Sequence, residues 1–412
     1  MGTQRDAHGI ALDEKMELKV WPAIGTDNCG MTGYLNNYKM KILLLGEYSN
    51  VHATLARGLR VLGHEVTVAS NGDFWKNYPR DIDLDRKVGK WGGVGLMAKI
   101  CTVMPRLVGY DVVQLINPMF VELKAQRNMA LYRLLRLMNK NIVMGAYGMD
   151  YYWVNGCCER KFLRYSDFNI GDVLRNDKDA LREKRDWIGT EKERLNRYIA
   201  EDADAIVAGL YEYYACYKPL FTRKTCFIPY PIEMPHDKGI KQIENGILNI
   251  FVGINKQRSQ YKGTDIMLEA AKEVVNRFPD RTRLVVAESV PFDEYKKMID
   301  SADVLLDQLY SYTPSMNTLL AMSKGIVCVG GGERENYEII NEQHLRPIVN
   351  VEPTYQSVVH ELQQLVTDHQ RVMRLKHESM EYVEKHHEYV KVAKEYESVY
   401  KILKHNNKAN FN

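Results

Sequence analysis

The chain has 412 residues, of which 45% are hydrophobic and 26% are charged, so we expect a globular protein of two or three domains. A formal net charge of +3 is too small to favour nucleic acid as the main partner. The longest apolar runs are strand-length, below the roughly 20 residues of a membrane span, and the first residues lack a signal-peptide core, so we expect a cytoplasmic protein.

Residues 1–39 show neither helical nor strand periodicity, and the buried strand KILLLG begins just after Met40. We therefore expect the folded part to begin at Met40, with residues 1–39 forming a poorly ordered extension. A structured N-terminal arm is the less favoured interpretation.

From Met40 onwards, apolar strand-like runs alternate with helical patterns. The predicted strands of this first series are KILLLG, HEVTVAS, DVVQLIN, NIVMGAY, AIVAGL and CFIPYPI. The Gly-rich segment 80–100 is expected to be a loop with a short helix. Such alternation is typical of a parallel, doubly wound sheet, which we assign to residues 40–230.

A Pro- and charge-rich segment, residues 231–246, is the predicted linker to a second alternating series in residues 247–386. The strands predicted there are LNIFVG, RLVVAES, DVLLDQ, GIVCVGG and PIVNV. Residues 387–412 form a predicted C-terminal helix. The predicted fold is α/β, with two Rossmann-like, doubly wound parallel-sheet domains facing a cleft.

The turn after the first strand, Gly46 to His52, holds one glycine and so lacks the G-x-G-x-x-G dinucleotide fingerprint. This argues against a nicotinamide or flavin enzyme. Glu47 and His52 are candidates for contact with a ligand, and a surface histidine at a helix start is an equal alternative for His52.

Tyr147 and Asp150 follow the strand NIVMGA, and an aspartate at the carboxyl end of a parallel strand points towards a bound ligand. The alternative is a helix N-cap. Asp81, Asp83 and Asp85 form a loop run that we expect to be solvated rather than to bind metal.

Seven cysteines without a C-x-x-C pair indicate reduced thiols, the adjacent Cys157 and Cys158 included. We therefore predict no metal site.

Arg258 and Lys262 lie just beyond the strand that ends at Gly253, and Lys262 precedes a helix. A cation beside a helix N-terminus opposes the helix dipole unless an anion is bound there too. The turn from Thr313 to Thr318 precedes another helix, and its small residues leave backbone amides open to a phosphate. Together these segments predict a diphosphate site.

These segments resemble the GT-B glycosyltransferases, specifically the large retaining family that includes many bacterial polysaccharide and lipopolysaccharide transferases. The likeness covers about residues 40–404. It is carried by MKILLLGEYSNVHATLARGLRVLGHEVTVAS, by Gly148 with Asp150, by R-x-x-x-K-G at 258–263, and by ADVLLDQ with NTLLAMSKGIVCVGG.

The resemblance implies hexosyltransferase-like transfer of a sugar from a nucleoside-diphosphate sugar to a glycan or lipid-linked acceptor, with retention and without metal or other cofactor. The residues implied to bind the donor are Gly253, Arg258, Lys262, Tyr312, Ser315, Met316, Asn317 and Thr318. Those implied at the acceptor are Glu47, His52, Tyr147 and Asp150. Arg258, Lys262 and Asp150 are the catalytic candidates, and the C-terminal helix is expected to cross back to the first domain.

Two departures concern glutamates that the family usually carries eight positions apart. Tyr312 and Leu320 stand in their places, and the second glutamate is thought to bind the nucleotide ribose. A GT-B pseudoenzyme or binding subunit and a GT-B sugar-nucleotide epimerase are therefore alternatives. A Rossmann oxidoreductase is disfavoured by the single-glycine turn.

Many relatives act at the cytoplasmic face of the membrane, so peripheral membrane contact is part of the expectation. The segment 131–140 carries Arg133, Arg136 and Lys140 among leucines. It is either a basic amphipathic face or, as we prefer, a core helix with solvated cations.

Overall fold

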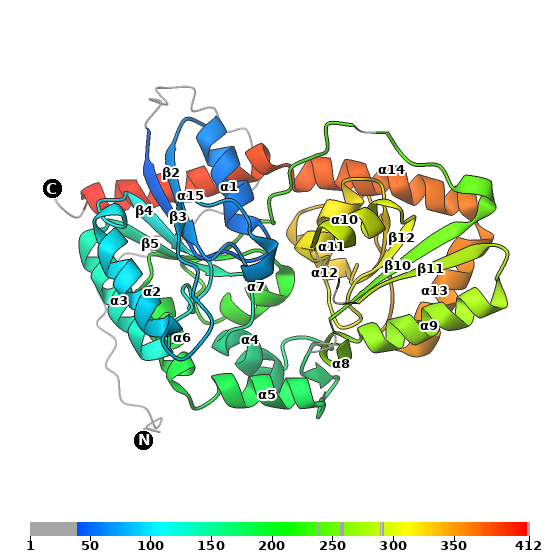
Figure 1. Ribbon diagram of the computed structural model, residues 1–412, viewed down its shortest axis with the longest axis horizontal. Helices are drawn as coiled ribbons and strands as arrows, with labels where there is room; N and C mark the ends of the chain where they lie inside the picture. The colour runs from blue at the N-terminus through cyan, green and yellow to red at the C-terminus, as the bar shows by residue number, and fades with distance from the viewer. Residues whose placement is uncertain (1–38, 238, 256–258, 289, 291, 410–412) are drawn as a thin grey trace, which may run out of the picture. The chain divides into compact units, whose positions relative to one another are not determined.

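The computed structural model describes residues 39–237, 239–255, 259–288, 290 and 292–409, and two separate parallel sheets organise them (Figure 1). No helix in these ranges is long and apolar enough to cross a membrane. The predicted fold class is confirmed, because strand and helix alternate through both sheets.

The first sheet has seven parallel strands in the order β3-β2-β1-β4-β5-β8-β9. Its strands are β1 (Lys41–Leu45), β2 (Glu65–Ser70), β3 (Ile82–Asp83), β4 (Val112–Leu115), β5 (Asn141–Ala146), β8 (Ala205–Ala208) and β9 (Thr225–Phe227). The central strands β4, β5 and β8 are buried along their whole length, as their near-continuous apolar sequences require.

Helices cover both faces of this sheet. They are α1 (Val51–Val61), α2 (Gly92–Val103), α3 (Ala125–Met138), α4 (Tyr151–Asn155), α5 (Lys178–Trp187), α6 (Glu191–Asp202) and α7 (Tyr211–Tyr217). Figure 1 shows α1 on one face and α3 with α6 on the other. A short antiparallel pair, β6 (Asn169–Ile170) and β7 (Val173–Leu174), lies in the connection between β5 and β8.

The second sheet has five parallel strands in the order β11-β10-β12-β13-β14. They are β10 (Leu248–Ile254), β11 (Thr282–Glu288), β12 (Val304–Leu306), β13 (Val327–Gly330) and β14 (Val349–Asn350). The helices of this half are α8 (Ser259–Lys262), α9 (Thr264–Arg277), α10 (Phe292–Asp300), α11 (Met316–Met322), α12 (Arg334–Ile339), α13 (Tyr355–Thr367) and α14 (His369–His386). The helix α9 packs on α13, and α11 packs on α14.

The last helix, α15 (Tyr389–Ala409), follows α14 and packs along α1 of the first half (Figure 1). Gly58 makes this contact possible, because a Cβ there would lie 2.6 Å from the Tyr389 carbonyl oxygen. Two buried tyrosines of α15 form hydrogen bonds with side chains of the first sheet and of the turn after β5. The hydroxyls of Tyr396 and Tyr147 lie 2.6 Å apart, and the Tyr400 hydroxyl donates to Gln114 Oε1 at 2.5 Å.

A buried ion pair ties α14 to the second sheet. Lys376 Nζ lies 2.6 Å from Asp303 Oδ1, and the two side chains are 1% and 0% exposed. The other carboxylate oxygen, Asp303 Oδ2, accepts from the Asn249 amide at 2.9 Å. A buried charge with a full set of partners is tolerated, whereas one that loses its partner is costly.

We therefore expect Lys376→Ala to lower the free energy of unfolding by about 3–5 kcal/mol, because it leaves Asp303 charged and buried. Lys324→Ala removes a Lys–Asp pair whose side chains are 25% and 46% exposed, and it should cost about 1 kcal/mol or less. Urea unfolding of both variants measures the difference. Equal losses would contradict the importance given to the buried pair.

Candidate functional site

Loops at the carboxyl edge of the second sheet meet where its strand order reverses. The chain runs from β10 to β11 on one side and then returns to place β12 on the other side of β10. Ligands of doubly wound sheets bind at such a reversal point. The loop after β12 contacts the loop after β10 there, because the Leu309 amide donates to the Lys262 carbonyl at 3.0 Å.

The predicted Lys262–Gly263 turn links α8 to α9 at this edge. Gly263 has φ of 69°, and a Cβ there would lie 2.6 Å from Leu309 Cβ, so glycine is required both by its backbone and by the close approach. Lys262 is half-buried. Burial raises the pKa of the nearby Asp167 to about 6, and the Lys262 ammonium opposes that rise. Arg258 lies outside the described residues.

Ser315 is the N-cap of α11, and its Oγ accepts from the Thr318 amide at 3.4 Å. Asp307, at the carboxyl end of β12, accepts from the Ser315 amide at 3.1 Å and from its hydroxyl at 3.0 Å. Met316 and Asn317 are the first residues of α11, so their amides have no acceptor within the helix. In this turn a carboxylate already accepts from the Ser315 amide, whereas the next two amides have no acceptor within the helix.

Tyr312, one of the two residues in place of a family glutamate, is 1% exposed. Its hydroxyl accepts from the Arg164 amide at 2.7 Å, and its ring stacks on Tyr211 at 5.9 Å between centroids. The hydroxyl of Tyr312, a residue implied by the resemblance to bind the donor, therefore contacts protein in this structure. Leu320, in the second glutamate's place, lies on α11 with 36% of its surface exposed.

Glu212, on α7 of the first half, holds the loop that contains Tyr312. Its Oε1 accepts from the Tyr312 amide at 2.7 Å and from the Thr313 amide at 3.1 Å. Its Oε2 accepts from the Thr313 hydroxyl at 2.6 Å. Sequence reasoning missed this residue, since nothing in the local pattern of α7 shows that its carboxylate meets a loop a hundred residues later.

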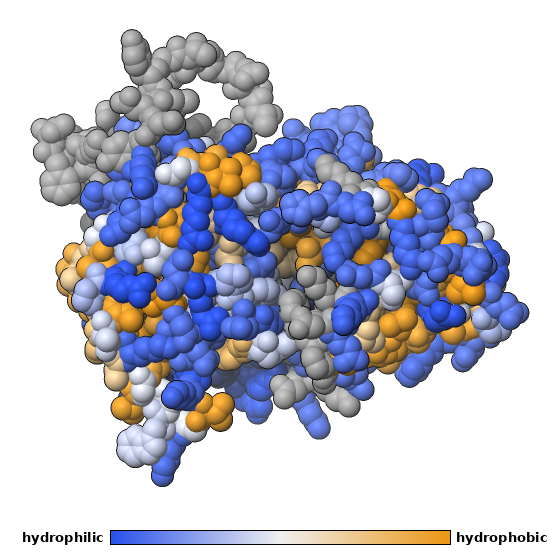
Figure 2. All heavy atoms as spheres, turned by 45° about the horizontal axis from the view of Figure 1, so that its top comes forward, coloured by the Kyte–Doolittle hydropathy of each residue, from blue (hydrophilic) through white to orange (hydrophobic). Residues whose placement is uncertain are grey.

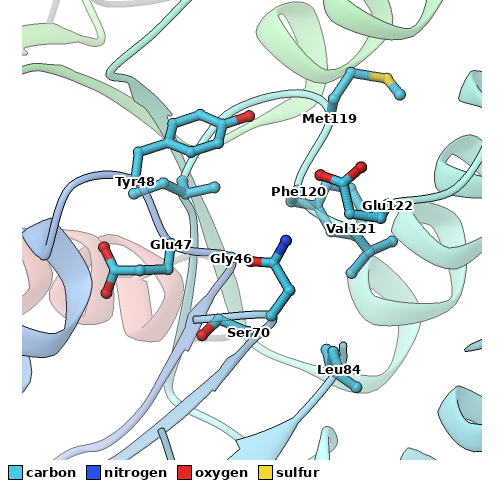
Figure 3. A pocket seen from close by; sticks show the side chains of 11 residues that line it. Gly46, Glu47, Tyr48, Ser70, Leu84, Met119, Phe120, Val121 and Glu122 are labelled. Carbon is cyan, nitrogen blue, oxygen red and sulfur yellow. The ribbon is translucent and has the colours of Figure 1, made fainter. Parts of the chain in front are cut away.

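A small pocket opens at the carboxyl edge of the first sheet, where β1, β2 and β4 end. This edge is the reversal point of that sheet, with β2 on one side of β1 and β4 on the other. Figure 3 shows the pocket between the turn after β1 and the segment after β4. Its lining residues are Gly46, Glu47, Tyr48, Ser70, Asn71, Leu84, Ile116, Met119, Phe120, Val121 and Glu122.

Two carboxyl groups at this pocket face different surroundings. Glu47 turns towards α1 (Figure 3) and accepts from the amides of His52 at 3.2 Å and Ala53 at 2.8 Å. Burial raises its pKa to about 8 against those hydrogen bonds. Glu122 lies on the opposite wall, where burial also raises its pKa. The pocket is therefore less negative near neutral pH than its two glutamates suggest.

His52 is fully buried rather than on the surface. Its Nδ1 donates to the Gly46 carbonyl at 2.8 Å, and Gln114 Nε2 lies 3.4 Å from its Nε2. Burial lowers its pKa to about 3, so the ring is neutral. His52 thus fixes the turn after β1 that forms one wall of the pocket.

Tyr147 and Asp150 are buried behind that wall. The Tyr147 hydroxyl accepts from Gln114 Nε2 at 3.0 Å. Asp150 is the N-cap of α4: its Oδ1 accepts from the Trp153 amide at 2.8 Å and its Oδ2 from the Tyr217 hydroxyl at 2.7 Å. Burial raises the pKa of Asp150 to about 7. The N-cap alternative accounts for these contacts.

Backbone strain gathers beside the pocket, a feature that sequence reasoning missed. Ser49 and Asn50 after β1, and Asp73 and Phe74 after β2, all have φ between 51° and 71° although none is glycine. The Ser49 amide donates to Asp73 Oδ2 at 2.9 Å and so ties the two loops together. Strained backbone of this kind persists where surrounding contacts enforce it, and it is common at binding sites.

Asp81 and Asp83 of the acidic loop run have partners within the protein, and the adjacent Cys157 and Cys158 are buried. Asp81 accepts from Arg60 at 2.6 Å, and Asp83 accepts from Lys99 at 2.5 Å. Cys157 is fully buried, and burial raises the pKa of its thiol. Within the described ranges, no group of three or more His, Cys, Asp or Glu side chains is placed to hold a metal ion.

No protein-family model and no curated protein matches this chain, whereas many solved structures resemble it in fold. Anabaena Alr3699/HepE in complex with UDP and glucose is 11% identical, with a TM-score of 0.52 over 87% of this chain and 98% of that chain. Sucrose-phosphate synthase from Thermosynechococcus elongatus is 13% identical, with a TM-score of 0.55 over 88% of this chain and 99% of that one.

WaaG, a glycosyltransferase involved in lipopolysaccharide biosynthesis, is also 13% identical, with a TM-score of 0.53 over 86% of this chain and 98% of that chain. At these identities the likeness establishes the architecture. The chain has the GT-B fold, as the resemblance in the sequence predicted.

Gly263→Ala should destabilise the protein by about 1 kcal/mol for the left-handed backbone and by a further 1–3 kcal/mol or so for overlap with Leu309. Gly189→Ala is the matched control, because Gly189 has φ of 73° and no atom within 4 Å of an added Cβ. It should show the backbone cost alone. Urea unfolding separates the two, and equal losses would refute the close-approach argument.

Glu47 gives a pH dependence whose sign follows from its raised pKa. Between its ordinary value of 4.5 and about 8, the folded protein keeps a proton that the unfolded chain releases. Stability contributed by this group is therefore lost as pH rises through that window. Glu47→Gln should flatten the fall in melting temperature between about pH 5 and about pH 8, whereas Glu269→Gln, on an exposed residue, should leave it unchanged. An unaltered slope in Glu47→Gln would count against the raised pKa.

Proposed function

We propose that this protein is a glycosyltransferase that moves a hexose from a nucleoside-diphosphate sugar to a glycan or lipid-linked acceptor in cell-surface polysaccharide biosynthesis. The observation that carries the proposal is the meeting of the Lys262–Gly263 turn with the loop after β12 at the reversal point of the second sheet. Two loops at such a point are suited to a nucleotide.

The proposed chemistry is stabilisation of the leaving group. As the bond between sugar and diphosphate breaks, negative charge grows on the phosphate oxygens. Lys262, Arg258 and the amides of Met316 and Asn317 would stabilise that charge more strongly in the transition state than in the bound donor. In this mechanism the protein's cations do the work that a metal ion does elsewhere. Retention of the anomeric configuration is part of the proposal and rests on the resemblance.

The acceptor is proposed to bind at the carboxyl edge of the first sheet, over the small pocket there. Tyr48, Phe120 and Met119 supply apolar and aromatic surface there, and Ser70 and Asn71 supply hydrogen-bonding groups. This mixture suits a sugar, which presents hydroxyls at its edges and C–H groups on its faces. Asp150 is retained as a positioning candidate, since its contacts fix the start of α4.

UDP is the nucleotide that we would test first. HepE, which shares this fold, has been solved with UDP, with UDP and glucose, and with UDP-glucose. That test would identify the base and the sugar that this protein uses.

A second candidate is a nucleotide-sugar-binding protein without transfer activity. The observation that favours it is the engagement of the Tyr312 hydroxyl with the Arg164 amide, which commits that position to a protein contact. Donor binding without turnover, against a broad panel of acceptors, would select this candidate over the transferase.

Arg258→Ala combined with Lys262→Ala should weaken UDP binding by roughly a hundredfold to ten-thousandfold, because each of the two charged hydrogen bonds contributes about 1.5–3 kcal/mol. The measurement is the rise in melting temperature with UDP and UDP-glucose, together with release of UDP in the presence of acceptor. Lys272→Ala with Arg277→Ala, on the exposed face of α9, is the matched control. Unchanged binding in the first variant would refute the assigned donor site.

A further inference from the structure

The loop after β2 carries two neighbouring aromatic side chains in exposed positions. Phe74 is 55% exposed and Trp75 is 63% exposed, and both belong to the short helical turn Phe74–Lys76. On the face in view, Figure 2 shows hydrophobic side chains in patches between hydrophilic ones. A single exposed hydrophobic residue is ordinary, whereas two large adjacent aromatics offer a contact area that suits a partner.

This loop is attached to the small pocket at the carboxyl edge of the first sheet. Asp73 Oδ2 accepts from the Ser49 amide at 2.9 Å and lies 2.7 Å from Lys76 Nζ. The Asp73 amide donates to Oδ1 of Asn71, a pocket-lining residue, at 3.0 Å. Burial raises the pKa of Glu122 on the opposite wall, and the charge of Asp73 adds to that rise. The aromatic pair follows Asp73 directly, at the rim of the pocket.

The backbone of the loop is held in an unfavourable conformation. Asp73, Phe74 and Asn77 have φ of 58°, 57° and 50°, in the left-handed region that bulky residues avoid. Two backbone hydrogen bonds enforce it: the Tyr78 amide donates to the Gly72 carbonyl at 2.9 Å, and the Asn77 amide donates to the Phe74 carbonyl at 3.1 Å. The position from which the two rings project is therefore set before a ligand binds, which lowers the entropy lost on binding.

The charges beside the two rings are paired within the protein. The side chains of Lys76 and Asp73, which form one pair, are only 16% and 15% exposed. Arg80 Nε lies 2.8 Å from Asp83 Oδ1, and Arg80 Nη1 donates to Asn77 Oδ1 at 2.8 Å. A ligand that meets this loop therefore finds aromatic surface and amide groups with little net charge. Such surroundings favour a neutral ligand over an acidic or a basic one.

We propose that Phe74 and Trp75 form an aromatic platform for a neutral glycan chain that extends beyond the sugar bound over the pocket. A hexose ring carries C–H groups on its faces, and these pack on the electron-rich face of an aromatic ring. Its hydroxyls lie at the edge of the ring, where Asn71 and Asn77 supply amide groups. The inference deepens the proposed function and rests on it for the identification of the glycan as an acceptor.

The first test measures binding of the full chain, without donor, to an array of immobilised glycans. The array holds monosaccharides, short chains and long chains of hexoses, in neutral forms and in forms that carry uronic acids. We expect long neutral chains to bind more tightly than monosaccharides. Phe74→Ala with Trp75→Ala should weaken that binding about tenfold or more, because two aromatic contacts are lost. Trp91→Ala with Phe162→Ala removes an exposed tryptophan and an exposed phenylalanine elsewhere and should leave the binding unchanged.

A second pair of variants separates ring stacking from general hydrophobicity. Trp75→Phe keeps an aromatic face and should retain most of the binding, whereas Trp75→Leu keeps an apolar side chain without a ring and should weaken it about threefold or more. Thermal unfolding verifies that all variants are folded. The proposal is overturned if no glycan on the array binds, if uronic-acid chains bind best, or if the control variant loses as much. It is also overturned if the chain self-associates through this loop and the double alanine variant abolishes that association.

Failure of the platform and failure of the proposed transfer give different results. The transfer assay uses UDP-glucose with a glycan that the array selects. Glycan binding that depends on the two rings, without transfer by the unaltered chain, supports the platform and counts against the transferase. Transfer with the same KM for the glycan in the unaltered chain and in the double alanine variant supports the transferase and overturns the platform. A raised KM with an unchanged kcat in that variant supports both.

Discussion

The buried carboxylate of Glu212 is the contact on which the arrangement of the candidate donor site depends. It stands on α7 of the first half, yet its oxygens accept from the Tyr312 and Thr313 amides and from the hydroxyls of Ser311 and Thr313. Burial raises its pKa, and the hydrogen bonds from the Thr313 hydroxyl, the Tyr312 amide and the Ser311 hydroxyl oppose the rise. The loop that it holds joins β12 to the start of α11, so a residue of one half determines where the other half presents its helix amides. A change at Glu212 would therefore reach the donor site without touching a ligand.

Helix α15 packs against the first half and constrains the first-sheet pocket in a similar way. Tyr396 and Tyr400 reach Tyr147 and Gln114, and Gln114 in turn lies beside His52, which holds the Gly46 carbonyl. The turn that forms one wall of the first-sheet pocket is thus connected, through buried hydrogen bonds, to the last helix of the chain. Buried polar networks of this kind specify one arrangement when every member has a partner. The tyrosines of α15 thus affect a pocket formed at β1, although they lie far from it in the sequence.

Much of the fold was predictable, because buried parallel strands have continuous apolar sequences that stand out from their polar connections. The long strands β1, β4, β5 and β10 lie where the sequence placed them. The segment 80–100 was expected to be a loop with a short helix, and packing of Leu96 and Ile100 accompanies a helix that begins at Gly92 and extends beyond the segment to Val103. At the candidate sites, the Lys262–Gly263 turn and the Ser315 cap could be found from local pattern. The contacts of Tyr312 with Arg164 and of Asp307 with Ser315 could not, since they depend on which loops the two sheets bring together.

The two reversal points differ in charge, and this difference follows from burial more than from composition. At the first sheet, burial raises the pKa of Glu47 to about 8 and also raises the pKa of Glu122, so the pocket is less negative than its two glutamates suggest. At the second sheet, burial raises the pKa of Asp167 to about 6, and the nearby Lys262 ammonium opposes that rise. For the proposed transfer, this difference would suit a diphosphate at the second sheet and a neutral, hydroxyl-rich acceptor at the first.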